Sequence, residues 1–304
     1  MIHRAEYAGP QALREMQSLA TRLFPRHGGR HAGDLAWAWT LANDATLPSA
    51  VWRDGDDIVA WAWFETPDEL TIQVDPAYPS LADEVLAWAD RSAPSPEPTA
   101  ITISAREQPL LSPALARHGF SAPDDGPFFS CQSADLLTAD LPSIPDLPTG
   151  YVIRPVDDQD IETRAALHRT VWNSTVITAE RHAAMRRTWP YKAEFDLIAA
   201  SPEGEAVAYC QGWYDELSGV GLFEPVGTHA DHRRLGLSRA IGITLLHAFA
   251  AAGARLATVS PRGDEAYPVP KLVYESIGFS EYTRTYTYSK HADRLSEVLA
   301  AGPA

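Results

Sequence analysis

The segment VGTHADHRRLGLSRAIG, residues 226–242, places three arginines around one glycine directly before a stretch with helical spacing. The preceding residues 221–227 (GLFEPVG) are predicted to form a strand, and residues 229–236 (HADHRRLG) a tight connection. A helix is expected over residues 238–252, because apolar side chains recur there on one helical face and Gly253 follows as a stop. The segment therefore predicts a strand, a short loop and a helix.

The loop has the composition of an anion-binding site. Amide groups in the first turn of a helix have no partner within the helix, and the macrodipole adds about half a positive charge there. Gly236 lets a ligand approach the backbone, and Arg233, Arg234 and Arg239 supply guanidinium groups that suit phosphate geometry. The loop lacks the signatures of a Walker loop and of a dinucleotide fold. An ordinary exposed basic turn is the alternative.

Bulk composition limits the classes of function. The chain has 304 residues and a formal net charge of −15, so we expect two domains and no nucleic-acid partner. Two cysteines, Cys131 and Cys210, are too few for a disulfide framework. The sequence contains neither a signal core nor an apolar stretch of the ~20 residues that cross a bilayer. We expect a cytoplasmic protein without a membrane partner, as a monomer or homodimer.

The domain boundary is predicted from composition. Proline, glycine and aspartate crowd together over residues 121–150, which is typical of a linker. We expect a first domain over residues 1–135, a linker over 136–150 and a second domain over 151–304.

The two halves resemble each other at low similarity. Residues 71–90 have the same strand, turn and helix layout as residues 225–246. Farther on, LARHGF at 115–120 corresponds to YESIGF at 274–279. Each half also carries a pair of β-rich runs joined by a turn. The fold class is therefore α/β, with a mixed sheet flanked by helices in each half.

The motifs of the second half occur in a recognisable order. Thr228, at the end of the predicted strand, lies five residues before Arg233 in the loop. A helix follows Ser238, and Tyr274 lies four residues before Gly278. This order resembles the GNAT superfamily (GCN5-related N-acetyltransferases), whose signature is a strand, Arg/Gln-x-x-Gly-x-Gly/Ala, a helix, and later Tyr-x-x-x-Gly-Phe. The chain is similar to tandem-GNAT proteins of the mycothiol synthase type, well over residues 151–290 and faintly over 1–135. The resemblance implies two tandem GNAT-like domains.

The resemblance implies acetyl-CoA as co-substrate. The backbone of residues 226–228 would hold the pantetheine arm, and residues 234–239 would cradle the diphosphate. Two departures from the family pattern are Ser238, where glycine or alanine is usual, and Tyr267, where asparagine is frequent. The implied cofactor-binding residues are Val226, Gly227, Thr228, Arg233, Arg234, Leu235, Gly236, Leu237, Ser238 and Arg239.

Two residues are candidates for proton transfer. By its place in the family pattern, Tyr274 would donate a proton to the departing thiolate, although a packed helix tyrosine is the alternative. Glu224 is the candidate base, because positions 224, 226 and 228 of a regular strand project to one face. An exposed strand glutamate is an equally good interpretation, and Asp215 and Glu216 are alternative carboxylates.

The sequence indicates the acceptor-binding residues less clearly than the cofactor-binding residues. Aromatic residues of the second half are candidates for lining the acceptor site, and each is explained equally well by core packing: Trp172, Trp189, Tyr191 and Trp213. Asp215 is a further candidate, because its carboxylate could attract a cationic substrate. In the first half, Pro79, Ala82 and Leu115 stand where the family's arginine, glycine and tyrosine would be, which indicates a degenerate copy. His229 and His232 lack a third ligand, so no metal is expected.

These patterns together predict an acetyl-CoA-dependent N-acetyltransferase. It would transfer acetyl to the primary amine of a small molecule by direct attack on the thioester, with catalysis in the second domain. A non-catalytic acyl-CoA-binding or interaction protein and an acyltransferase with a longer acyl-CoA donor are the alternatives.

Overall fold

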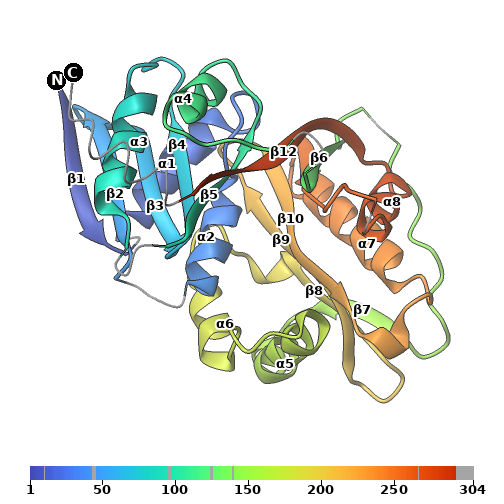
Figure 1. Cartoon of the computed structure of the whole chain (residues 1–304). Helices are drawn as coiled ribbons and strands as arrows, with labels where there is room; N and C mark the ends of the chain where they lie inside the picture. The colour runs from blue at the N-terminus through green and yellow to red at the C-terminus, as the bar shows by residue number, and fades with distance from the viewer. Residues whose placement is uncertain are drawn as a thin grey trace. The chain divides into compact units, whose positions relative to one another are not determined.

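The computed structural model describes residues 1–9, 11–42, 46–94, 98–123, 126–138, 140–265 and 267–291 (Figure 1). Residues 292–304, which the predicted second domain included, lie outside the described residues. The chain forms two compact units that exchange segments. Residues 32–41 belong to the second unit together with residues 130–283, and residues 284–291 belong to the first.

The first unit is a mixed α/β structure. Its strands follow the order β1-β2-β3-β4-β5-β12, in which neighbours are antiparallel except for the parallel pair of β4 and β5. The strands are β1 (Ile2–Ala8), β2 (Pro48–Asp54), β3 (Asp57–Thr66), β4 (Glu69–Val74), β5 (Ala100–Arg106) and β12 (Ser280–His291). The helices are α1 (Leu13–Leu23), α3 (Leu81–Ser92) and α4 (Leu111–Arg117).

The second unit repeats this construction. Its strands follow the order β6-β11-β10-β9-β8-β7, and β10 and β11 are the parallel pair. The strands are β6 (Phe128–Asp135), β7 (Val152–Pro155), β8 (Asp196–Ala200), β9 (Ala206–Asp215), β10 (Val220–Thr228) and β11 (Leu256–Val259). The α-helices are α2 (Ala32–Leu41), α5 (Ile161–Trp172), α6 (Ala179–Met185), α7 (Leu237–Ala251) and α8 (Val269–Glu275), and three 3-10 turns are η1 (Asp158–Asp160), η2 (Ala193–Phe195) and η3 (Ala230–His232).

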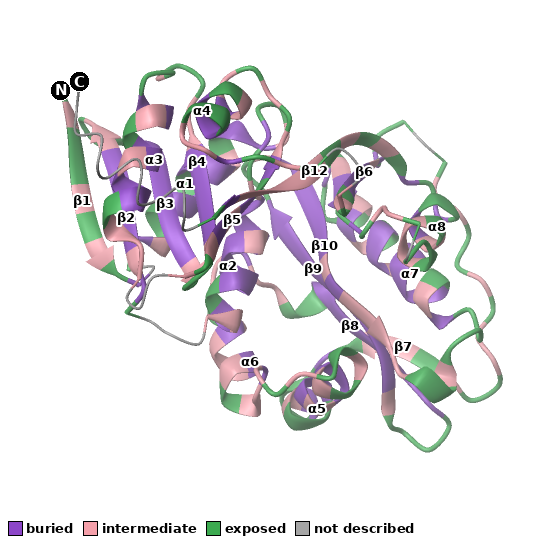
Figure 2. Cartoon of the chain, viewed as in Figure 1, coloured by how far each residue is buried: buried purple, intermediate pink, exposed green. Residues whose placement is uncertain are grey.

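Helices cover both faces of the second unit's strands. Figure 1 shows α7 and α8 on one side and α5 and α6 on the other. The predicted apolar face of α7 is buried, and Phe249 lies so close to β10 that a Cβ on Gly221 would stand 2.4 Å from its ring. Burial on both faces explains why β9 is covered along almost its whole length (Figure 2). Among the described residues, no helix is long and apolar enough to span a membrane.

Helix α2 is the segment of the N-terminal half that packs in the second unit. Its residues Ala36 and Trp37 join the apolar cluster around Trp213 and Leu222. At the other end, the Arg181 guanidinium donates to the Thr40 and Leu41 carbonyls at 3.2 and 3.3 Å, which satisfies groups that a helix C-terminus leaves unpaired.

A glycine allows α2 to lie this close to β9. A Cβ on Gly33 would stand 2.4 Å from Cβ and Cγ of Trp213, so neither backbone nor ring can give way easily. Gly33→Ala is expected to lower the free energy of unfolding by about 1–3 kcal/mol. Gly242→Ala on α7 is the control, because its Cβ would meet the flexible end of the Ile277 side chain at 2.9 Å and the Phe223 ring at 3.9 Å, an ordinary contact distance. Equal urea midpoints for the two variants would contradict this packing account.

Candidate functional site

The parallel strands of the second unit separate after the third of the nine residues of β10. Only Val220–Leu222 pairs with β11, opposite Leu256–Thr258, whereas β10 continues to Thr228. On its other side, β10 stays paired with β9 through Thr228 and Ala208. Beyond Leu222, no described strand pairs with the edge of β10 that faces away from β9, and we call this the open edge.

The peptide groups that point to this open edge can be assigned from the ladder. The N–H of His229 donates to the Val207 carbonyl at 2.8 Å, so His229 and Gly227 direct their peptide groups toward β9. Val226 and Thr228 then direct theirs to the open edge, in agreement with the Arg233 guanidinium donating to the Thr228 carbonyl at 3.4 Å. An extended ligand that carries amide groups can pair with these two residues.

The start of α7 provides a second set of unpaired groups. Gly236 occupies the N-cap with φ +78°, a left-handed conformation that favours glycine. The first intrahelical bond runs from Ala240 to the Gly236 carbonyl. The N–H groups of Leu237, Ser238 and Arg239 precede it, and no residue that the structure describes accepts from them.

The loop and the strand end form one continuous surface. Thr228 Oγ1 and Ser238 Oγ are 2.8 Å apart, which ties the end of β10 to the first turn of α7. Arg233, Arg234 and Arg239 are exposed beside these amides. The structure thus brings together all ten residues that sequence analysis assigned to the cofactor. The surface suits a ligand with an extended amide arm and a diphosphate.

Glu224 lies at an irregularity of β10. The register between β10 and β9 shifts between Phe223 and Val226, so one extra residue interrupts the alternation. Alternation is regular from Val226 to Thr228, but it is interrupted before Val226, so the expectation that regular alternation places Glu224 on their face was wrong. The Glu224 carboxylate is nevertheless close enough to Tyr274 for its charge to raise the pKa of that phenol.

Tyr274 lies on α8 with its ring between aromatic neighbours. Ring centroids of Phe223 and Phe279 are 6.3 and 5.7 Å away, and the residue is 8% exposed. Burial, and then the charges of Cys210 and Glu224, raise the pKa of Tyr274 well above its usual range. The phenol therefore keeps its proton at neutral pH, and within the described part of the chain its hydroxyl has no hydrogen-bond partner. These properties suit a proton donor.

The five candidates for acceptor binding do not form one group. Asp215 caps the turn between β9 and β10, where its carboxylate accepts from the Leu217 and Ser218 N–H groups, at the opposite end of β10 from Thr228. Trp213 is fully buried, and its indole donates to the Glu224 carbonyl at 2.6 Å. Trp189 is half-buried.

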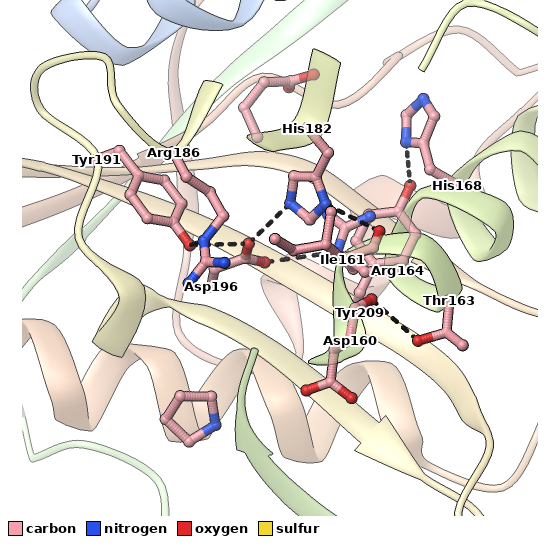
Figure 3. Close-up of polar contacts among 12 residues, drawn as sticks. Asp160, Ile161, Thr163, Arg164, His168, His182, Arg186, Tyr191, Asp196 and Tyr209 are labelled. Atoms are coloured by element: carbon pink, nitrogen blue, oxygen red, sulfur yellow. Dashed lines mark hydrogen bonds and ion pairs between the residues drawn. The ribbon is translucent and has the colours of Figure 1, made fainter. Parts of the chain in front are cut away.

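Tyr191 belongs to a buried polar network at the base of α5 and α6 (Figure 3). Its hydroxyl lies 3.3 Å from Asp196 Oδ2 and accepts from Arg186 Nε at 3.0 Å. His182 Nε2 and Arg164 Nε lie 3.2 and 3.5 Å from the Asp196 carboxylate. Burial alone would raise the pKa of Asp196, but the Arg164 charge and the His182 hydrogen bond outweigh it and lower that pKa. The network fastens both helices to β8.

A cavity of about 590 Å³ opens beside this network. Its lining includes Arg186, Arg187 and Lys192, so it is basic. Arg186 and Lys192 already form ion pairs with Asp158 and Glu216, so the cavity offers less free positive charge than its composition suggests.

Trp172 differs from the other candidates because it is 54% exposed at the end of α5. Its indole Nε1 donates to the Tyr209 hydroxyl at 2.7 Å, and His168 Nδ1 lies 2.8 Å from the same oxygen. Sequence analysis missed Tyr209 and His168. Alternation along β9 could have placed Tyr209 on the same face as Trp213, but nothing in the sequence pairs it with α5.

The buried imidazole of His168 makes stability depend on pH. Burial and the neighbouring cations, Arg164 first among them, lower its pKa from 6.5 to about 3. Below pH 6.5 His168 is protonated in the unfolded chain but stays neutral in the folded chain. The free energy of unfolding therefore decreases as the pH falls from 6.5 toward 3. His168→Gln should therefore flatten the fall of the urea midpoint between pH 7 and pH 5. An unchanged slope would exclude His168 as its source.

Comparison with known proteins gives the fold. No protein-family model and no curated protein matches the sequence. Among solved structures, a tandem GNAT protein from the clavulanic acid biosynthesis pathway is similar at 17% identity, with a TM-score of 0.66 over 100% of both chains. A GCN5-related N-acetyltransferase from Sphaerobacter thermophilus is similar at 18% identity, with a TM-score of 0.62 over 95% of both chains. The chain has the tandem GNAT fold.

Proposed function

We propose that this chain is an acetyl-CoA-dependent N-acetyltransferase that acetylates the primary amine of a small molecule. The observation that carries the proposal is the open edge of β10 directly beside the unpaired N–H groups at the start of α7. Peptide groups of Val226 and Thr228 would pair with the pantetheine amides, and the first turn of α7 would hold the diphosphate. The GNAT fold of the chain supports this assignment.

The second unit would carry the reaction. In the first unit, β4 and β5 also separate, since only Glu69 pairs with Thr102. The following helix α3, however, begins with Asp83 and Glu84 in its first turn and has no arginine there. Carboxylates at this position repel a diphosphate. We therefore assign the coenzyme to the second unit, which contains most of the domain expected over residues 151–304, and we regard the domain expected over residues 1–135 as a degenerate copy.

The acceptor ammonium must lose two protons, the departing sulfur must gain one, and the charge on the carbonyl oxygen must be stabilised. Glu224 would take the first proton of the ammonium, and the free amine would then attack the thioester carbonyl carbon to form the C–N bond. As the C–S bond breaks, Tyr274 would give its proton to the sulfur and regain one from the nitrogen, which is acidic once the C–N bond has formed. An N–H group on the open edge of β10 would stabilise the carbonyl oxygen as it becomes negative.

A panel of primary amines tests the proposal. The purified full chain is incubated with acetyl-CoA and each amine, and the released coenzyme A is measured with a thiol reagent. Acetylation of at least one amine, confirmed by product mass, is expected. Acetyl-CoA binding by calorimetry without turnover across the panel would instead favour a non-catalytic binding protein, and preference for longer acyl-CoAs would revise the donor.

A further inference from the structure

We infer that Trp172, held in place by Tyr209, forms a subsite for the acyl acceptor, and that the acceptor amine is attached, directly or through a short linker, to a ring with a flat face. This inference rests on the proposed function and specifies its substrate. The ring can be aromatic or a pyranose, since both present a flat face to an indole.

The first observation is that an exposed tryptophan has a fixed orientation. Trp172 is the last residue of α5, and Asn173 ends the helix in a left-handed conformation with φ +47°. Although Trp172 is 54% exposed, its Nε1–H donates at 2.7 Å to the hydroxyl of Tyr209, which is fully buried. Most exposed side chains adopt several rotamers, whereas this indole presents a defined surface to solvent.

The second observation is that the Tyr209 hydroxyl behind the indole has partners both as an acceptor and as a donor. An indole N–H can only donate, so the Tyr209 hydroxyl accepts from Trp172 and is left to donate its own hydrogen to His168 Nδ1 at 2.8 Å (Figure 3). His168 is neutral, because burial lowers its pKa to about 3, and it then carries its proton on Nε2. Arg164 packs 3.5 Å above the Tyr209 ring from the same helix. These contacts orient Trp172. His168 Nδ1 accepts the hydrogen bond from Tyr209, so this nitrogen is not available as a base.

The third observation is the position of this pair beside β10. A Cβ on Gly227 would lie 2.9 Å from Cε1 of Tyr209 and 2.8 Å from Cγ1 of Val171, the residue before Trp172. Gly227 stands between Val226 and Thr228, whose peptide groups point to the open edge. The end of α5 therefore touches the strand at the point where the acetyl group would lie.

The two faces of β10 would then contact different ligands, the coenzyme on the α7 side and the acceptor on the α5 side. The Thr228 side chain contacts Ser238 on the α7 side, where the diphosphate would bind. Gly227 faces Tyr209 and Val171 on the α5 side. An acceptor that reaches the thioester from the α5 side would pass over the indole of Trp172. The buried His168 ring packs beneath this surface, since it lies 6.2 Å from the Trp172 ring at an angle of 33°.

The exposed indole face of Trp172 favours one class of acceptor amine. Indole faces stack on flat rings and attract cations, so a ring next to a primary ammonium would gain from both. An open-chain alkylamine has no flat face and would gain little. Ring stacking of this kind should change the acceptor KM about threefold to tenfold.

Three amines and three variants test the inference. We compare 2-phenylethylamine, glucosamine and n-hexylamine in steady-state kinetics with wild type, Trp172→Ala, Trp172→Phe and Tyr209→Phe. Trp172→Ala should raise KM for the preferred ring amine about threefold to tenfold and leave KM for acetyl-CoA and for hexylamine unchanged. Trp172→Phe should recover part of the loss, and Tyr209→Phe should raise the same KM because the indole loses its acceptor. Leu217→Ala, at an exposed turn far along β9 and β10, serves as control.

The outcomes separate the inference from the proposed function. Preference for 2-phenylethylamine or for glucosamine identifies the kind of ring. Turnover of hexylamine with the same kcat/KM as both ring amines, or an equal effect of Trp172→Ala on all three, would overturn the inference and leave the acetyltransferase proposal intact. Absence of both acetyl-CoA binding and turnover would overturn both.

Discussion

Replacing Gly236 with glutamate is expected to weaken acetyl-CoA binding about 100-fold or more. The carboxylate would stand at the N-cap, directly before the free N–H groups of Leu237, Ser238 and Arg239, and would repel a diphosphate. Hydrogen bonds to charged groups contribute about 1.5–3 kcal/mol each, and about 1.4 kcal/mol is a tenfold change in Kd. Isothermal titration calorimetry with acetyl-CoA measures the loss.

A matched control removes the effect of backbone strain. A side chain in the left-handed region costs roughly 1–2 kcal/mol wherever it occurs. Gly204 in the turn between β8 and β9 has φ +86° and, like Gly236, no atom within 4 Å of its would-be Cβ. Gly204→Glu should therefore destabilise the fold equally and bind acetyl-CoA as wild type does. Equal affinities of the two variants would exclude the loop as the diphosphate site.

Replacing Tyr274 with phenylalanine is expected to lower kcat about 100-fold to 10,000-fold, the usual contribution of a positioned acid. Phenylalanine keeps the ring contacts with Phe223 and Phe279, so KM for acetyl-CoA and the melting temperature should change little. Because the pKa of Tyr274 is raised, its ionisation should not limit wild-type activity near neutral pH.

Tyr214→Phe provides the control for that experiment. Tyr214 is also buried on the α7 side, with its ring near Phe195 and Phe249, but it lies toward the far end of β9 from the open edge of β10. Its variant should retain full kcat. Wild-type kcat in Tyr274→Phe would instead identify Tyr274 as a packing residue.

The site's local architecture was predictable because one short segment contains its signals. The expected helix over 238–252 is α7 at Leu237–Ala251. Gly236 was singled out because it lets a ligand approach the backbone, and the structure adds that it adopts a left-handed conformation. The face of Glu224 could not be predicted, because a bulge adds a residue and shifts the alternation on which the expectation depended.

Contacts between segments that are distant in the chain could not be predicted from the sequence. Periodicity identifies an element but not its partner, so nothing indicated that α2 packs in the second unit or that β12 continues beside β5. Gly33 within a helix was the available signal, since glycine there is unfavourable unless a neighbour approaches closely. The acceptor residues were equally ambiguous, because a tryptophan that lines a site and one that fills a core look alike in sequence.

The central claim is that the diphosphate of acetyl-CoA binds at the first turn of α7. A crystal structure of the full chain with acetyl-CoA tests it most directly. We predict diphosphate oxygens within hydrogen-bond distance of the Leu237, Ser238 and Arg239 N–H groups, and the pantetheine arm along Val226 and Thr228. Coenzyme density confined to the first unit, or located away from α7 in the second, would contradict the account.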